Sequence, residues 1–137
     1  MNFNSQICTT KIQSERLLAL GLKKETADMT LQTALNVCYT IPFQEAVEYF
    51  ENRHLPPHPT ILPAWSLHRL IEMLNYQVIY NGKKYEPVIA IGGMAYQDVC
   101  SDDPIVGWSG DLYTDVIDSI KWVISIEQFN EEYLEEL

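Results

Sequence analysis

The chain has 137 residues and a formal net charge of -10, with 47% hydrophobic and 20% charged residues. This length suits one domain that can bury a core, and the composition argues against global disorder. No apolar run approaches the roughly 20 residues that a membrane helix needs. The N-terminus also lacks a basic start followed by an apolar run, which predicts a cytoplasmic protein without a secretory signal.

The excess negative charge lies in the C-terminal third of the chain. From Ala95 onward there are eleven acidic residues and one basic residue, Lys121, whereas residues 1–94 hold eight of each kind. Nucleic-acid binding depends on cationic side chains, so direct binding to a phosphate backbone is disfavoured there. A protein partner with a basic surface, or simple solubility, fits this distribution better.

The three cysteines, Cys8, Cys38 and Cys100, lie far apart and form no Cys-x-x-Cys pair. An odd number at such spacing argues against a disulfide framework and against a zinc ribbon. We therefore expect three reduced thiols, at least one of them buried.

The first half of the chain predicts two helices. After a frayed start at residues 1–9, a helical pattern over 10–21 stops at Gly21, a residue type that commonly follows a helix end. Pro42 suits the first position of a second helix over 42–53, in which an apolar stripe faces away from the glutamates.

Between and after these helices the pattern is less regular. The run 29–41 combines helical spacing with strand-like residue types; we expect a strand near 27–32 and leave the remainder open. The proline-rich run 54–59 cannot continue the second helix, because proline removes backbone donors. It is predicted to be a connector over the surface.

Residues 63–91 form the clearest folding unit, a helix that leads into a hairpin. Ser66 is expected to be the N-cap of a helix over 66–75. Trp65 lies just before this cap and can fold back over Leu70 as a hydrophobic staple does. The buried stripe of the helix would contain Leu67, Leu70, Ile71 and Leu74.

Two turn signals then predict an antiparallel meander over 76–99. Asn81-Gly82 favours a type I′ turn, because that turn needs positive φ at both central positions. A second turn at Gly92-Gly93 would set Ile91 opposite Met94. With these two registers the same sheet face stays apolar through three strands.

The C-terminal third is predicted to contain a loop at 101–110 and a helix over 111–126 that is capped by Asp111. One face of this helix is apolar, and the opposite, solvent face would carry Asp115, Asp118 and Lys121. An acidic tail follows at 127–137. Taken together, the elements predict a single α+β domain, a three- to four-stranded antiparallel meander with about four helices packed on one face.

No set of residues matches the spacing of a known catalytic or metal site. His54 and His58 are four residues apart, but the prolines around them prevent a shared helical face. His68 lies on a helix, where a solvated position is its ordinary role. No serine or cysteine lies in a nucleophile motif and no glycine loop cradles phosphate, so no catalytic residue, metal or cofactor is predicted.

Trp108 lies between a glycine and a serine in the acidic loop. An indole at such a place either covers the core or serves as an exposed anchor for a partner. The predicted partner-binding residues are this tryptophan and acidic residues that follow it in the sequence: Trp108, Asp111, Asp115, Asp118, Glu131 and Glu132.

Several motifs taken together resemble a known group of proteins. They are Leu20-Gly21-Leu22 followed by Glu25-Thr26-Ala27-Asp28-Met29, then Pro63-Ala64-Trp65-Ser66-Leu67, the Asn81-Gly82 turn with Tyr85, and Trp122-Val123-Ile124. The chain is similar in these motifs to small acidic proteins of gut anaerobic bacteria and their prophages and mobile elements, a group without an established activity. The helix at 42–53 and the proline run after it depart from that pattern. The resemblance implies an accessory protein of a phage or mobile element and assigns no functional residue.

The favoured hypothesis is a non-enzymatic accessory protein that binds another protein through the acidic C-terminal third. A nucleic-acid mimic that inhibits a basic protein is the first alternative, with Asp111, Asp115, Asp118 and the tail glutamates in place of phosphates. A metal-dependent hydrolase that uses His54, His58 or His68 is the second. The sequence does not indicate the oligomeric state.

Overall fold

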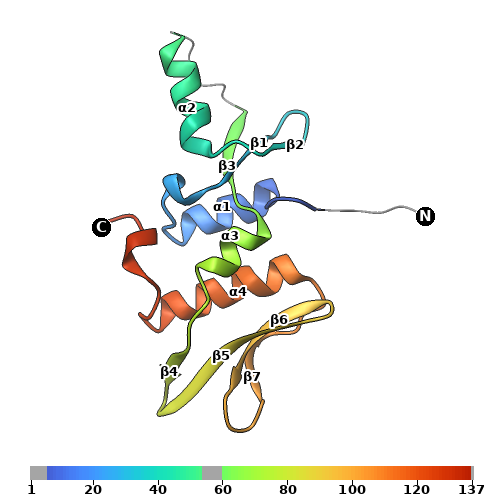
Figure 1. The fold of residues 1–137 in the computed structure, drawn as a ribbon, viewed down its shortest axis with the longest axis vertical. Coiled ribbons are helices and arrows are strands. Elements are labelled where there is room, and N and C mark those ends of the chain that lie inside the picture. The colour runs from blue at the N-terminus through green and yellow to red at the C-terminus, as the bar shows by residue number, and fades with distance from the viewer. Residues whose placement is uncertain (1–5, 54–59, 137) are drawn as a thin grey trace, which may run out of the picture. The chain divides into compact units, whose positions relative to one another are not determined.

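The computed structural model describes residues 6–53 and 60–136. These residues form an α+β fold with four α-helices and two antiparallel sheets, which confirms the predicted class. Contacts divide the chain into two compact units, one made of Met1–Arg69 with Tyr133–Leu137 and the other of Leu70–Glu132. Figure 1 shows the elements of each unit in chain order.

The first unit holds a three-stranded sheet in the order β2-β1-β3. The predicted strand near 27–32 is confirmed, whereas β3 was not predicted; its Pro63 cannot donate to a strand ladder. A proline is tolerated there because β3 is an edge strand. The unit contains α1 (Lys11–Ala19), the 3₁₀ turn η1 (Lys24–Thr26), β1 (Met29–Gln32), β2 (Val37–Tyr39), α2 (Phe43–Asn52) and β3 (Ile61–Ala64).

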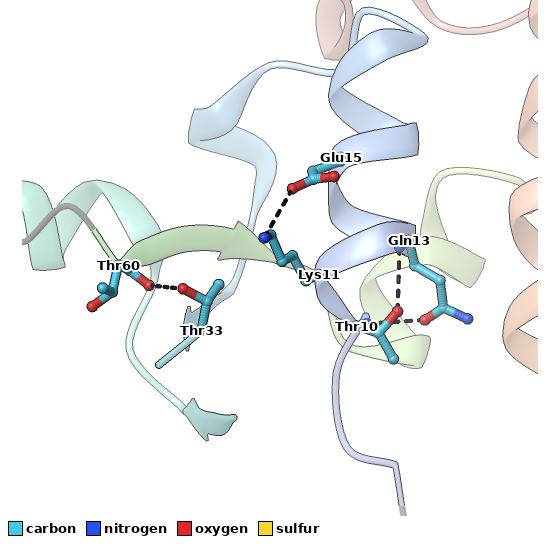
Figure 2. Close-up of polar contacts among 6 residues, drawn as sticks. All are labelled: Thr10, Lys11, Gln13, Glu15, Thr33 and Thr60. Atoms are coloured by element: carbon cyan, nitrogen blue, oxygen red, sulfur yellow. Dashed lines mark hydrogen bonds and ion pairs between the residues drawn. The ribbon is translucent and has the colours of Figure 1, made fainter. Parts of the chain in front are cut away.

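Helix α1 begins with a capping box, as Figure 2 shows. The Thr10 hydroxyl accepts the backbone N–H of Gln13 at 3.2 Å, and the Gln13 side chain accepts the backbone N–H of Thr10 at 3.0 Å. The helix ends as predicted before Gly21, which has a φ of 100°. Within the helix Leu17 is fully buried, whereas Ile12 is 77% exposed. The helix predicted over 10–21 is therefore confirmed by reciprocal local hydrogen bonds.

One face of the three-stranded sheet packs on the N-terminal segment. Cys8, Met29, Leu31 and Ala64 are buried together there, and Cys38 packs against them. Cys8 and Cys38 form a disulfide, so the prediction of three reduced thiols is wrong. The pairing of β1 with β2 places Cys38 opposite Leu31 on the face that covers Cys8, and no local sequence pattern carries that information. Cys100 is free and exposed.

The segment that follows β3 is fixed by hydrogen bonds within the first unit. The indole N–H of Trp65 donates to the Thr26 hydroxyl at 2.9 Å. As predicted, Ser66 caps the next helix, since its hydroxyl accepts the backbone N–H of Arg69 at 3.2 Å. Asp28 in turn accepts the backbone N–H of Ser66 at 2.8 Å. This helix, α3 (Leu67–Glu72), is shorter than the predicted 66–75.

The C-terminal tail docks on the turn after α1. The backbone N–H of Lys23 donates to Tyr133 O at 2.8 Å, and that of Glu135 donates to Gly21 O at 2.7 Å. Leu22 and Leu134 form an isolated antiparallel bridge. A short 3₁₀ turn, η2 (Glu131–Tyr133), precedes this contact, so the residues from Tyr133 onward belong with the first unit.

The second unit is a meander in the order β4-β5-β6-β7 with one long helix. Its first hairpin has the predicted register, with Tyr80 opposite Lys83 across a turn in which Asn81 and Gly82 both have positive φ. The predicted loop at 101–110 contains the last strand, which was not predicted. The elements are β4 (Val78–Tyr80), β5 (Lys83–Ala90), β6 (Gly93–Asp98), β7 (Pro104–Gly107) and α4 (Leu112–Ser125).

The predicted register of the second hairpin is wrong. The structure pairs Ala90 with Gly93 and Ile89 with Met94, so the turn consists of Ile91 and Gly92. As a result, Ile91 is fully exposed instead of lying on the apolar face. Gly93 belongs to the strand, where a Cβ atom would lie 2.7 Å from Asp115 Oδ2. Gly93 therefore allows close packing against Asp115 and is not part of the turn.

Helix α4 packs against β6 and β7 (Figure 1). Its cap is the predicted Asp111, whose side chain accepts the backbone N–H of Thr114 at 3.3 Å. Its apolar face is buried as predicted and contains Tyr113, Val116, Ile117, Ile120 and Val123. The prediction that Asp115 lies on the solvent face of this helix is wrong, because Asp115 is fully buried. The helices α1 and α2 pack against strands of the first sheet instead.

Candidate functional site

The loop between β7 and α4 displays Trp108, the first of the predicted partner-binding residues. Trp108 has a φ of 55°, in the left-handed region that is uncommon for a bulky side chain. It is 37% exposed, and one edge of its ring packs over Gly93, where a Cβ atom would lie 3.1 Å from Cε3. The indole therefore covers part of the sheet and leaves the rest of its surface accessible.

Gly107 brings the backbone of this loop against the neighbouring strand. A Cβ atom at Gly107 would lie 2.1 Å from the carbonyl oxygen of Met94 and 2.6 Å from Cα of Ala95. Its φ of 115° is also one that glycine alone adopts without strain. The backbone N–H of Trp108 then donates to the same Met94 carbonyl at 3.0 Å. The start of the loop is thus fixed by backbone contacts with β6.

Asp115 fixes the other side of the loop from inside the second unit. Its Oδ2 accepts the backbone N–H of Met94 at 3.0 Å, and its Oδ1 accepts that of Ser109 at 2.8 Å. A buried carboxylate is tolerated when both oxygens are hydrogen-bonded, and such bonds to a charged group contribute about 1.5–3 kcal/mol each. Asp115 therefore positions Trp108 and cannot itself contact a partner, which corrects its predicted role.

The remaining predicted acidic residues fall into two groups. Asp111 is exposed three residues after Trp108, and Asp118 is half-buried further along α4. Glu131 and Glu132 are exposed but follow the other end of this 14-residue helix, which is about 20 Å long at 1.5 Å per residue. Trp108 and Asp111 therefore lie in the same short loop, and the length of α4 separates this loop from the two glutamates along the chain.

The charge around this loop is strongly negative within its own unit. Residues 70–132 carry eleven acidic and three basic side chains. Beyond Asp111, the exposed members near β7 are Asp102 and Asp103, and Ile105 adds an exposed apolar side chain on the strand. An exposed indole in an acidic unit is complementary in chemistry to an apolar pocket with a basic border.

The histidines give no support to a metal site. His68 is exposed on α3, and His54 and His58 lie outside the described residues. In the part of the chain that the structure describes, no group of three histidine, cysteine, aspartate or glutamate side chains could hold a metal ion. The hypothesis of a metal-dependent hydrolase stays a prediction without structural support.

Sequence reasoning named Trp108 and Asp111 as partner-binding residues and did not identify the residues that position Trp108. Gly93 and Gly107 were predicted in a turn and a loop, and only the structure places them in strands, where a glycine often marks a close backbone approach. The comparisons with known protein families, curated proteins and solved structures give no match. Within residues 6–53 and 60–136, no helix has the length and apolar character needed to cross a membrane.

Proposed function

We propose that the protein is a non-enzymatic accessory protein that binds another protein, with Trp108 as the anchor of the interface. The supporting observation is the backbone of Trp108, which Gly107 and Asp115 hold in a left-handed conformation while part of the indole stays exposed. Such a conformation costs about 1–3 kcal/mol and persists where the surrounding structure imposes it. Strained residues of this kind cluster at binding sites, which favours display of the side chain.

The chemistry of the surface indicates the kind of partner. Tryptophan is enriched among residues that dominate the binding energy of interfaces, because its large rigid surface enters a pocket with little loss of entropy. Asp111 and the other exposed acidic residues of this unit would steer a basic surface toward the anchor. The proposed partner therefore has an apolar pocket for the indole and lysine or arginine residues around that pocket.

The nucleic-acid mimic is less well supported. That hypothesis requires Asp111, Asp115 and Asp118 to stand in a row in place of phosphates, and Asp115 is fully buried. The resemblance to proteins of prophages and mobile elements supports an accessory role in such an element, and this origin is part of the proposal.

The proposal is tested by capture of the tagged full chain from its native cells, with wild type compared to Trp108→Asn. Asparagine tolerates the left-handed backbone, so this variant removes the indole and keeps the loop conformation. We expect the wild type to retain a stoichiometric protein partner and the variant to lose it. The captured partner, once identified, allows dissociation constants to be measured for both chains.

Ile91→Ala is the matched control, because Ile91 is a fully exposed apolar residue in another turn of the same unit. It should retain the partner at wild-type level. Association should also slow as the salt concentration rises, since exposed charges are screened beyond about 10 Å at 0.1 M salt. The proposal fails if the wild type retains no stoichiometric partner, or if Trp108→Asn and Ile91→Ala retain it equally well.

A further inference from the structure

A cavity of about 480 Å³ lies between α2 and one face of the β2-β1-β3 sheet. It belongs wholly to the first unit, away from the Trp108 loop in the sequence. A volume of this size is typical of small-molecule sites. The residues around it are Thr30, Gln32, Tyr39, Ile41, Glu45, Ala46, Tyr49, Phe50 and Ile61.

The strand register explains why the cavity forms on this face. Thr30 pairs with Tyr39 and Gln32 pairs with Ile61, so these four side chains share one face because cross-strand partners point the same way. The opposite face is the one that packs on Cys8. Helix α2 contributes its residues at positions 45, 46, 49 and 50, which recur on one side of a helix.

The walls of the cavity are mainly apolar and aromatic. Tyr39, Tyr49 and Phe50 contribute rings, and Tyr49 is 51% exposed. The guanidinium of Arg53 lies 3.7 Å from the centroid of the Tyr49 ring, so this ring already accepts a cation on one face. A ligand with an apolar body would remove the exposed rings of Tyr39 and Tyr49 from water, which is favourable.

The polar side chains of the cavity differ in how they are satisfied. The Thr30 hydroxyl donates to Ile41 O at 2.8 Å, and the Tyr39 hydroxyl donates to the Gln32 side-chain oxygen at 3.3 Å. Glu45 is the charged residue of the lining, and nothing among residues 6–53 and 60–136 forms a hydrogen bond or ion pair with its carboxylate. Glu45 is exposed, and a carboxylate that shares a cavity lining with aromatic rings can recognise an organic cation.

We propose that this cavity binds a small organic cation, an ammonium group carried on an apolar or aromatic body. The ammonium pairs with the Glu45 carboxylate at the helix side, and the apolar body lies against Tyr39, Tyr49 and Phe50. This site is independent of the interface around Trp108, because every residue of its lining belongs to the first unit.

Three probes of matched shape test the charge requirement on the full-length protein: 2-phenylethylammonium, 2-phenylethanol and 3-phenylpropionate. Backbone amide shifts of isotope-labelled protein, followed by NMR during titration, report both affinity and place. We expect the cation to bind up to about fivefold more tightly than the alcohol, the upper end of the gain from one exposed ion pair, and the anion to bind most weakly. The shifted amides should be those of α2 and the facing strands.

Glu45→Gln should reduce the affinity for the cation by up to about fivefold and leave the affinity for the alcohol unchanged. Glu48→Gln is the matched control, because Glu48 is exposed on the same helix and does not line the cavity. Ala46→Phe should weaken all three probes by filling the space, provided that circular dichroism shows a folded chain. If that variant does not fold, Glu45→Gln still decides the question.

The proposal is overturned if no probe shifts the lining amides at millimolar concentration, or if the anion binds as tightly as the cation. It is also overturned if Glu45→Gln and Glu48→Gln bind the cation equally well. Loss of partner capture by Trp108→Asn would not bear on this result, since the two sites involve different residues.

Discussion

The carboxylate of Asp115 accepts the backbone N–H of Met94 at 3.0 Å and so links helix α4 to strand β6. Asp115→Asn keeps the shape of this residue but turns an amide N–H₂ toward one of two backbone donors. We expect the free energy of unfolding to fall by about 2–4 kcal/mol, because a buried donor loses its acceptor. Urea denaturation followed by tryptophan fluorescence measures this change.

Asp103→Asn is the control for that substitution. Asp103 is exposed, and its carboxylate accepts no hydrogen bond from the residues that the structure describes. Its free energy of unfolding should stay within about 0.5 kcal/mol of wild type. An equal effect of the two substitutions would mean that Asp115 does not hold the loop of Trp108.

Gly107 should be the glycine of this loop that tolerates alanine least. Gly107→Ala would place a Cβ atom 2.1 Å from the Met94 carbonyl oxygen and would separate β7 from β6. We expect a loss of about 3 kcal/mol or more in the free energy of unfolding. Gly110→Ala is the comparison, because Gly110 also has positive φ but no atom lies within 4 Å of its added Cβ.

The left-handed backbone alone should cost Gly110→Ala about 1–2 kcal/mol. The difference in unfolding free energy between the two variants separates the effect of the close approach of β7 to β6 from that of the left-handed backbone. Thermal denaturation of both variants under one set of conditions measures this difference. Equal losses would show that the contact with Met94 is relieved at little cost.

The disulfide between Cys8 and Cys38 should contribute strongly to stability. It closes a loop over a sequence separation of 30 residues. Such a loop corresponds to about 3–4 kcal/mol when the stabilisation is attributed to lost entropy of the unfolded chain. Reduction with dithiothreitol, or the double variant Cys8→Ser with Cys38→Ser, should lower the free energy of unfolding by that amount.

Cys100→Ser should leave the free energy of unfolding unchanged, because Cys100 is exposed and free. Thiol titration of the purified protein under denaturing conditions without reductant should find one reactive thiol per chain. Three reactive thiols would instead restore the expectation from the sequence and remove the predicted effect of dithiothreitol.

Asp98 should make stability depend on pH in the acid range. The backbone N–H of Cys100 donates to its carboxylate at 2.8 Å and, with contacts from Ser101 and Lys83, holds the pKa of Asp98 below its ordinary value of 3.8. A depressed pKa in the folded state contributes stability above the unfolded pKa. That stability is lost as the pH falls through the lowered value.

Comparison of wild type with Asp98→Asn by urea denaturation between pH 7 and pH 2 measures this contribution. The wild type should be more stable at pH 7, and the difference should shrink below about pH 3.8, where the carboxylate of the unfolded chain takes up a proton. A difference that stays constant over the whole range would show that the charge of Asp98 plays no part.

The sequence by itself determined the features that depend on neighbours in the chain. Ser66 and Asp111 cap their helices through hydrogen bonds to residues three positions away. Asn81-Gly82 sets the first hairpin because its two residues accept positive φ. These interactions span a few residues, so residue type and spacing predict them.

Only the tertiary structure decided the features that depend on residues far apart in the chain. The sequence indicated neither the strands β3 and β7 nor the disulfide, because each requires a partner strand or thiol with no local signal. Asp115 has the periodicity of a solvent face, yet two backbone donors from the loop and β6 satisfy it inside the unit. The sequence periodicity of a helix indicates which residue types share a face. Burial of that face depends on which other parts of the fold pack against it.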